Sequence, residues 1–216
     1  MLQDRVEEYL GAIYRLRTGE GEPLPLSQLA EYFGFSPVSI HEMIRKLDDG
    51  GWVDFHPYRG VTLTERGEAS ARALLRRHRL WERFLTDSLN IPWDEAHLIA
   101  GDLEHAAPEL VTDRLAEFMG EPDACPHGGP IPPALQSSEE RCLRSLGAGA
   151  EARVTRISPE TPALLRRIAK QDLIPGRLLR ILAQTETETR VHLQDMPEPA
   201  LSIPETDAQA IWVELM

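Results

Sequence analysis

A pair of short helix patterns near the amino terminus constrains the fold more than any other stretch of the chain. Residues 26–33 and 36–47 both follow helical spacing, and a turn at Gly34 separates them. Ser36 is a favourable N-cap, and Pro37 occupies the first helical position, where a missing N–H costs nothing. Two helices joined by a short glycine-containing turn predict a helix-turn-helix, whose second helix enters the major groove of DNA.

Two strand-like runs, residues 52–56 and 60–64, follow the second helix. The turn between them carries Tyr58 and Arg59. A hairpin in this position predicts a wing, with both side chains placed to lie along the phosphate backbone.

The residues predicted to face DNA all lie on the reading helix or on the wing. They are Ser36, Pro37, Ser39 and Glu42 at the exposed start of the helix, with His41, Arg45, Tyr58 and Arg59 as phosphate contacts. For Arg45 and Lys46 an ordinary solvated helix face is the alternative interpretation.

The formal net charge of −12 argues against nucleic-acid binding by the chain as a whole. The charge is unevenly distributed, however. Residues 1–80 hold 11 Lys and Arg against 12 Asp and Glu, whereas residues 81–216 hold 12 against 23. The near-neutral amino-terminal part can therefore bind phosphates if its basic residues share a face, and cations would moderate the repulsion from the acidic remainder.

Composition places the chain among ordinary globular proteins, with 42% hydrophobic and 27% charged residues. No apolar run has transmembrane length, and the first residues form an acid-containing amphipathic helix pattern rather than a signal peptide. The two cysteines imply no disulfide framework. We therefore expect a cytoplasmic protein that does not engage a membrane.

Histidines and glutamates recur at helical spacing between residues 78 and 105. They are His78, Glu82, His97, Glu104 and His105. Residues four apart, or seven apart, share one face of a helix. Imidazole and carboxylate groups that converge from two facing helices form a site for a divalent first-row metal ion. The alternative is that all five are solvated surface residues.

The segments around these residues read as three helices, over residues 70–89, 94–106 and 108–119, with Asp94 as the cap of the second. Their apolar side chains include Leu98, Leu103, Leu110, Val111, Leu115 and Phe118. This is more apolar surface than two short helices hide alone, so the pattern predicts a self-associating interface.

A proline- and glycine-rich loop, residues 120–133, follows the helices and contains Cys125 and His127. Two candidate ligands without a second pair are a weak indication of zinc, and a structural role is the favoured interpretation.

The last third of the chain is mostly strand-like. Strand patterns cover residues 152–157, 177–182, 189–193 and 210–215, and a short helix pattern covers residues 161–171. Short strands separated by turns, with one helix, predict a small, partly open β-barrel.

Taken in order, six segments of the chain resemble one family. They are EEYLGAIYRL, SPVSIHEMIRKL, HPYRGVTLTERG, RHRLWERFLTD, DLEHAAPE and CPHGGPIPP. In this order they resemble the diphtheria-toxin-repressor and manganese-transport-regulator family of metal-dependent transcriptional repressors. The resemblance covers nearly the whole chain.

The resemblance implies a multidomain, mainly α protein. Its expected parts are a winged helix-turn-helix domain over residues 1–73, a helical metal-binding and dimerisation domain over residues 74–140, and an SH3-like, ferrous-transport-accessory-like β-barrel over residues 141–216.

The resemblance also implies a set of metal ligands. His78, Glu82 and His97 match ancillary ligands of the iron-type members, Glu104 and His105 match a pair used by both branches, and Glu8 and Glu160 match further positions. An oxygen ligand at Glu8 favours a harder ion such as Mn²⁺.

Two positions depart from the family pattern. Gly101 replaces a coordinating residue, with Asp102 beside it as a substitute, and Gly11 replaces a second-site glutamate. We therefore expect the strongest site at His78, Glu82 and His97, and an altered or weaker one elsewhere.

The resemblance predicts a homodimeric regulator rather than an enzyme. It would bind double-stranded operator DNA when loaded with Mn²⁺ or Fe²⁺ and would repress metal-uptake genes. One alternative is a winged-helix regulator that metal does not control, which the glycines at positions 101 and 11 favour. The other is a metalloenzyme, although the sequence contains no HExxH motif.

Overall fold

The computed structural model describes residues 2–17, 19, 21–134, 137–194 and 200–216. It divides into two compact units, Met1–Arg77 and His78–Met216, and the boundary falls inside one long helix. No helix in the described part of the chain combines the length and apolar character needed to cross a membrane.

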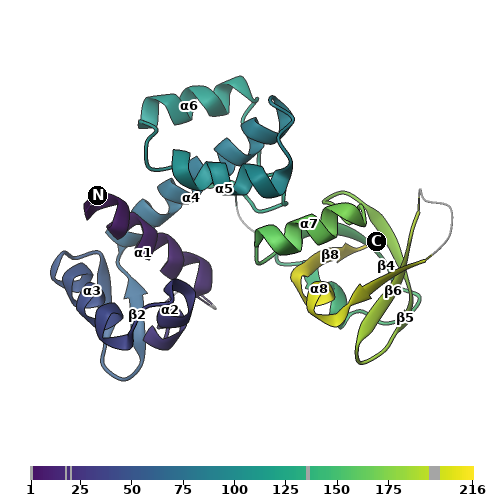
Figure 1. Cartoon of the computed structure of the whole chain (residues 1–216), viewed down its shortest axis with the longest axis horizontal. Helices are drawn as coiled ribbons and strands as arrows, with labels where there is room; N and C mark the ends of the chain where they lie inside the picture. The colour runs from purple at the N-terminus through teal and green to yellow at the C-terminus, as the bar shows by residue number, and fades with distance from the viewer. Residues whose placement is uncertain (1, 18, 20, 135–136, 195–199) are drawn as a thin grey trace. The chain divides into compact units, whose positions relative to one another are not determined.

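The first unit is a three-helix head followed by a two-stranded hairpin. Its elements are α1 (Leu2–Leu16), α2 (Leu26–Phe33), α3 (Pro37–Asp49), β1 (Val53–His56), β2 (Gly60–Leu63) and the first part of α4 (Glu65–Asp87). Figure 1 shows the three helices gathered beside the hairpin. Their fully buried side chains, among them Leu10, Ile13, Leu29, Ile40 and Ile44, form one core. The predicted winged helix-turn-helix is confirmed.

Local chemistry fixes the two turns of this head. Gly34 takes φ 66°, a conformation that suits glycine, and its N–H closes the last turn of α2. Ser36 caps α3 by accepting a hydrogen bond from the Ser39 backbone N–H at 3.2 Å, as predicted. At Gly60 an added Cβ would lie 2.0 Å from the Leu24 carbonyl oxygen, so only glycine fits where the wing returns.

The second unit begins with the remaining turns of α4, followed by α5 (Trp93–Leu103) and α6 (Glu109–Phe118). Leu80, Leu115, Ala116 and Ile131 form one small core, and Leu85, Ala96 and Ala100 form another. The predicted cap at Asp94 is wrong, because α5 begins one residue earlier behind Pro92. Asp94 instead pairs with Arg166 at 2.5 Å.

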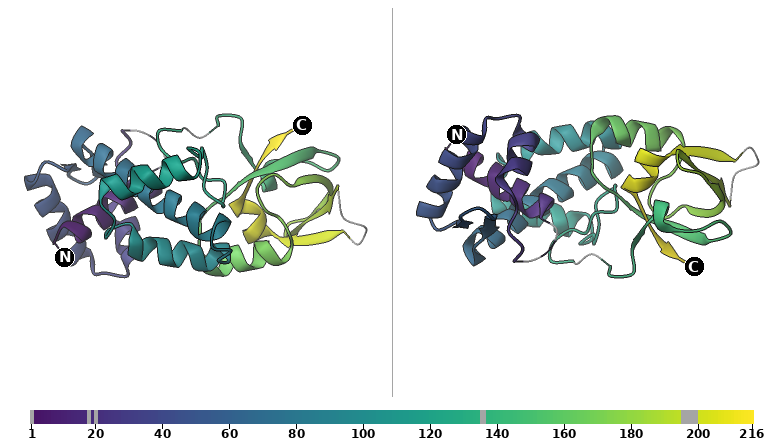
Figure 2. Two further views of the ribbon diagram at one scale, coloured as in Figure 1. Left: turned by 90° about the horizontal axis from the view of Figure 1, so that it is seen from above. Right: turned by 90° about the horizontal axis from the view of Figure 1, so that it is seen from below.

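The rest of the second unit is a curled, six-stranded antiparallel sheet with two helices, visible in both views of Figure 2. The strands run in the order β3-β8-β4-β5-β6-β7. They are β3 (Arg141–Cys142), β4 (Glu151–Ile157), β5 (Leu178–Gln184), β6 (Glu188–Leu193), β7 (Leu201–Pro204) and β8 (Ile211–Leu215); the helices are α7 (Pro162–Lys170) and α8 (Glu205–Ala210). The predicted SH3-like domain is confirmed, with β3, β7 and α8 added.

The helical part and the barrel part of this unit are joined at α5 and α7. Trp93 is buried in the barrel core, and its indole N–H donates to the Leu165 carbonyl oxygen at 3.2 Å. A buried indole that also satisfies its N–H contributes both apolar burial and a fixed orientation. This junction holds α5 close to the segment that leads into α7.

Candidate metal centre

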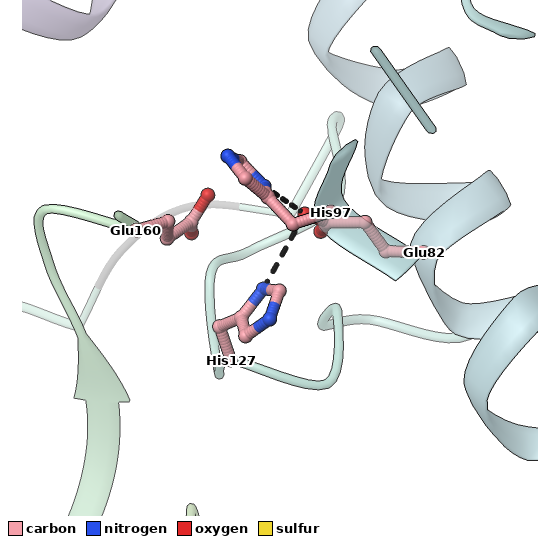
Figure 3. A group of neighbouring side chains, drawn as sticks. All are labelled: Glu82, His97, His127 and Glu160. Atoms are coloured by element: carbon pink, nitrogen blue, oxygen red, sulfur yellow. Dashed lines mark hydrogen bonds and ion pairs between the residues drawn. The ribbon is translucent and has the colours of Figure 1, made fainter. Parts of the chain in front are cut away.

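Four separate segments of the second unit deliver side chains to one point. Glu82 comes from α4, His97 from α5, His127 from the proline- and glycine-rich loop, and Glu160 from the turn before α7. One ligand atom from each residue lies within 4.8 Å of the other three. Figure 3 shows the four side chains directed toward one another. We call this group the first centre.

Glu82 is the middle of the first centre and is 0% exposed. Its Oε1 lies 2.9 Å from His78 Nε2, 2.7 Å from His97 Nδ1 and 3.4 Å from His127 Nδ1. A carboxylate so deeply buried is stable only with such partners around it.

Neighbouring groups fix the ligands of the first centre. His127 Nε2–H donates to the Trp93 carbonyl oxygen at 3.2 Å, which leaves Nδ1 turned toward Glu82. Arg79 contacts the Pro130 carbonyl oxygen and lies 3.9 Å from Glu160. Such outer contacts select the tautomer of a ligating histidine and raise its basicity.

The charges in the first centre and in the side chains next to it shift several pKa values. Burial alone would lower the pKa of His78, but Glu82 and Glu104 outweigh burial and raise the pKa to about 10. Burial also lowers the pKa of His127 and the Glu82 charge raises it; the charge outweighs burial, so the pKa of His127 is raised. Conversely, the charges of His78 and His127 overcome burial and hold the pKa of Glu82 well below its usual range. In the absence of a metal ion, protonated His78 and His127 therefore supply the positive charge that balances Glu82.

The residues present fit a divalent metal ion. Glu82 Oε2 is buried and has no hydrogen-bond partner among the described residues, although a buried carboxylate oxygen normally has one. Two imidazoles and two carboxylates are a donor set that suits Mn²⁺, Fe²⁺ or Zn²⁺. A metal ion in the first centre would give Glu82 Oε2 a partner and would balance the charge of the carboxylate.

A second group adjoins the first centre through His78. His78 Nδ1 lies 2.7 Å from Glu104 Oε2, and His105 Nε2 lies 3.4 Å from Glu104 Oε1. Glu104 is buried and ends α5. We call His78, Glu104 and His105 the second group.

Two other predicted ligands, Asp102 and Glu8, have exposed side chains. Asp102 is exposed and takes no part in the first centre. Glu8 is exposed on α1, in the first unit. An added Cβ at Gly101 meets no atom within 4 Å, whereas at Gly11 it would lie 3.1 Å from Leu74 and 3.3 Å from Arg15.

The structure places His127 among the candidate ligands, where the sequence interpretation favoured a structural role. Cys125 Sγ lies 3.7 Å from His127 Nδ1, so the cysteine also borders the first centre. Burial raises the pKa of the Cys125 thiol well above its usual value. The Cys125-Pro-His127 sequence was the only sequence feature that pointed to this loop. The folded structure was needed to show that His127 lies beside Glu82.

In the first unit, every residue predicted to face DNA is exposed. These residues are Ser36, Pro37, Ser39, His41, Glu42, Arg45, Tyr58 and Arg59. Arg45 lies over the Phe55 ring at 5.6 Å and 3.8 Å from Asp48, so it is loosely held. Tyr58 is fully exposed at the tip of the wing with φ 63°.

Helices α5 and α6 leave apolar side chains uncovered. Leu98, Ile99, Leu110, Val111 and Phe118 are exposed, the last by 71%. Exposed apolar side chains on these two helices are candidates for the predicted self-associating interface.

A winged-helix head joined to a helical domain with a buried imidazole and carboxylate centre defines a metal-responsive DNA-binding regulator. Family models agree along the chain: the iron dependent repressor N-terminal DNA binding domain matches residues 1–61, its metal binding and dimerisation domain matches residues 64–133, and the FeoA domain matches residues 141–215. The chain belongs to the iron-dependent repressor family, whose members are metal-dependent transcriptional repressors and not enzymes.

Individual relatives support the assignment. The iron-dependent repressor IdeR of Mycobacterium leprae is 31% identical over 194 residues, which are 90% of this chain and 75% of that protein. The diphtheria toxin repressor of Corynebacterium jeikeium is 28% identical over 183 residues, 80% of this chain and 76% of the relative. A manganese-dependent transcriptional repressor solved in complex with manganese has a TM-score of 0.88 and 34% identity, covering 98% of this chain and all of its own.

Proposed function

We propose that this chain is a homodimeric repressor that binds operator DNA when Mn²⁺ or Fe²⁺ fills its metal sites, and that it controls metal-uptake genes. The observation that carries the proposal is Glu82, a buried carboxylate among three imidazoles, with one oxygen unpaired within the described part of the chain. The names of the relatives, iron-dependent in one case and manganese-dependent in another, support these two ions.

The proposed ligands are His78, through Nε2, with Glu82, His97, His127 and Glu160 at the first centre. Glu104 and His105 are the proposed ligands at the second group, with Glu8 as an additional ligand. Binding there would release protons from imidazoles whose pKa values are raised in the metal-free protein. The ion would draw together four segments of the second unit that are distant in sequence.

DNA binding is assigned to the exposed start of α3 and to the wing. In this proposal Ser36, Pro37, Ser39 and Glu42 face base edges, and His41, Arg45, Tyr58 and Arg59 face phosphates. Two copies, paired through the apolar surface of α5 and α6, would present two reading helices about one helical turn of DNA apart or a multiple of it. A regulator of this kind works in the cytoplasm, where the DNA is.

Metal control would follow from linkage, since α4 carries residues of both units. An ion shifts a conformational equilibrium only through its different affinity for the two states. A typical coupling of about 1–3 kcal/mol corresponds to roughly 5–150-fold in operator affinity.

The test is a DNA-binding titration at fixed salt with a duplex selected from a random pool in the presence of Mn²⁺. Anisotropy is measured with EDTA, with Mn²⁺ and, anaerobically, with Fe²⁺. We expect metal to raise affinity for the selected duplex at least about fivefold. Equal affinity with and without EDTA would reject metal control and favour the metal-independent regulator, which the glycines at positions 101 and 11 support as the second candidate.

A further inference from the structure

We propose that His78 is shared by the two metal groups and that its single imidazole ring couples them. The inference rests on the proposed function and deepens it, because it names the residue through which filling one site changes the affinity of the other. The carrying observation is that the two ring nitrogens of one buried side chain face different groups.

Contacts at both ring nitrogens fix the orientation of the His78 imidazole. Nε2 lies 2.9 Å from Glu82 Oε1 and 3.1 Å from His97 Nδ1, while Nδ1 lies 2.7 Å from Glu104 Oε2. The side chain is 5% exposed, so water cannot replace either contact. A ring flip would put Cδ2 and Cε1 in the places of Nδ1 and Nε2 and would break all three contacts together.

The chemistry gives each nitrogen a different task. When Nε2 faces a metal ion in the first centre, it must present a lone pair, and the ring proton then resides on Nδ1. Nδ1–H donates to Glu104 Oε2, which makes the imidazole a more basic ligand and fixes its tautomer. Glu104 is thus a positioning residue for the first centre, although it belongs to the second group.

The same hydrogen bond acts in the opposite direction. Held through Oε2 by His78, Glu104 keeps Oε1 turned toward His105, 3.4 Å away. An ion in the first centre therefore orders the carboxylate that a second ion would need. Because coupling between binding sites is reciprocal, an ion at the second group strengthens the first by the same factor.

The test measures Mn²⁺ affinity at the first centre, by competition with a chelator, in the full-length protein and in the Glu104→Gln variant. The substituted amide retains the volume of the side chain but accepts a weaker hydrogen bond, so we expect affinity to fall about tenfold, as for other outer partners of ligating histidines. Glu104→Asp keeps the charge and shortens the reach, and we expect a similar loss. Glu95→Gln on α5 is the matched control: it removes one exposed carboxylate and should leave affinity unchanged.

A second readout does not depend on affinity. In Cd²⁺-loaded protein, ¹⁵N NMR of the His78 ring should show Nε2 as the metal-facing nitrogen and a slowly exchanging proton on Nδ1. Glu104→Gln should shift the Nδ1 resonance and speed the exchange of its proton, whereas Glu95→Gln should not.

The outcomes separate the two proposals. Wild-type protein that binds Mn²⁺ with the same affinity as both Glu104 variants would overturn the coupling and leave the proposed function standing. A loss in Glu104→Gln that Glu95→Gln matches and Glu104→Asp lacks would also overturn it, because charge alone would then account for the effect. Wild-type protein that binds no Mn²⁺ would reject both.

Discussion

The first centre and the second group use the same ligand types but are assembled differently. Four segments spread over residues 82–160 meet at the first centre around a carboxylate that is fully buried. The second group depends on the adjacent pair Glu104 and His105, and on His78, with a glycine at position 101 where a ligand is expected. Ligands recruited from distant segments are held by the tertiary structure, whereas a local pair needs further donors to complete its coordination.

The largest expected effect comes from Glu82→Gln. The amide cannot supply the charge that three imidazoles surround, and its NH₂ group would face their nitrogens. We expect Mn²⁺ affinity at the first centre to fall at least about 100-fold, the upper range for metal-site partners. Isothermal titration calorimetry measures the loss directly.

A matched change sharpens the contrast. Glu109→Gln, at the exposed start of α6, removes the same charge outside both groups and should preserve affinity and stoichiometry. Full Mn²⁺ affinity in Glu82→Gln would mean that the strongest metal site lies outside the first centre.

A gain of function is expected at Gly101. Position 101 lies about one helical turn before Glu104, the C-cap of α5, so its side chain is on the same side of the helix as Glu104. An added Cβ there meets nothing within 4 Å, and we expect Gly101→Glu to strengthen the second ion about tenfold. Mn²⁺ stoichiometry and affinity, measured by chelator competition, should show a tighter second ion.

Gly11→Glu is the contrasting variant. Leu74 and Arg15 crowd that position at 3.1 and 3.3 Å, so the same substitution should bring no comparable gain and should lower the melting temperature. If Gly101→Glu binds the second ion no better than wild type, the missing ligand does not explain the weakness of the second group.

A pH effect follows from His78. Its pKa of about 10 in the folded, metal-free protein exceeds the ordinary 6.5, so the proton stabilises the folded state fully below pH 6.5, and this contribution is lost as pH rises through about 10. We expect the free energy of unfolding of the metal-free protein to decline over that range in urea titrations. With Mn²⁺ present the trend should reverse, because deprotonated imidazole is the ligand. Parallel curves with and without Mn²⁺ would contradict this assignment.

Helical spacing made most of the fold predictable. The helix patterns over residues 26–33 and 36–47, the Ser36 cap and the wing agree with the structure to within two residues, because local periodicity and capping determine them. Ligands spaced by helical turns, such as His78 and Glu82, were found for the same reason.

What the sequence did not reveal depends on long-range contacts. β7 is four residues long and ends in proline, and α8 has six residues, so neither has enough length to show a period. His127 lies in a loop without periodicity. Only the three-dimensional structure shows that this loop brings His127 to Glu82 and makes it a candidate ligand. Asp94 has the residue type and position of a helix cap. Its actual partner, Arg166, lies 72 residues away, so the local pattern could not reveal it.

The smallest effect is expected at the contact between α5 and α7, behind the first centre. Arg166 pairs with Asp94 at 2.5 Å, but its side chain is 57% exposed, so solvent weakens the pair to within about 1 kcal/mol. Arg166→Gln should therefore lower Mn²⁺ affinity at the first centre by less than about fivefold. Arg114→Gln, which breaks an exposed pair with Glu117 on α6, serves as the control and should have no effect. A loss in Arg166→Gln as large as that in Glu82→Gln would mean that the docking of α7, more than the buried carboxylate, determines the strength of the first centre.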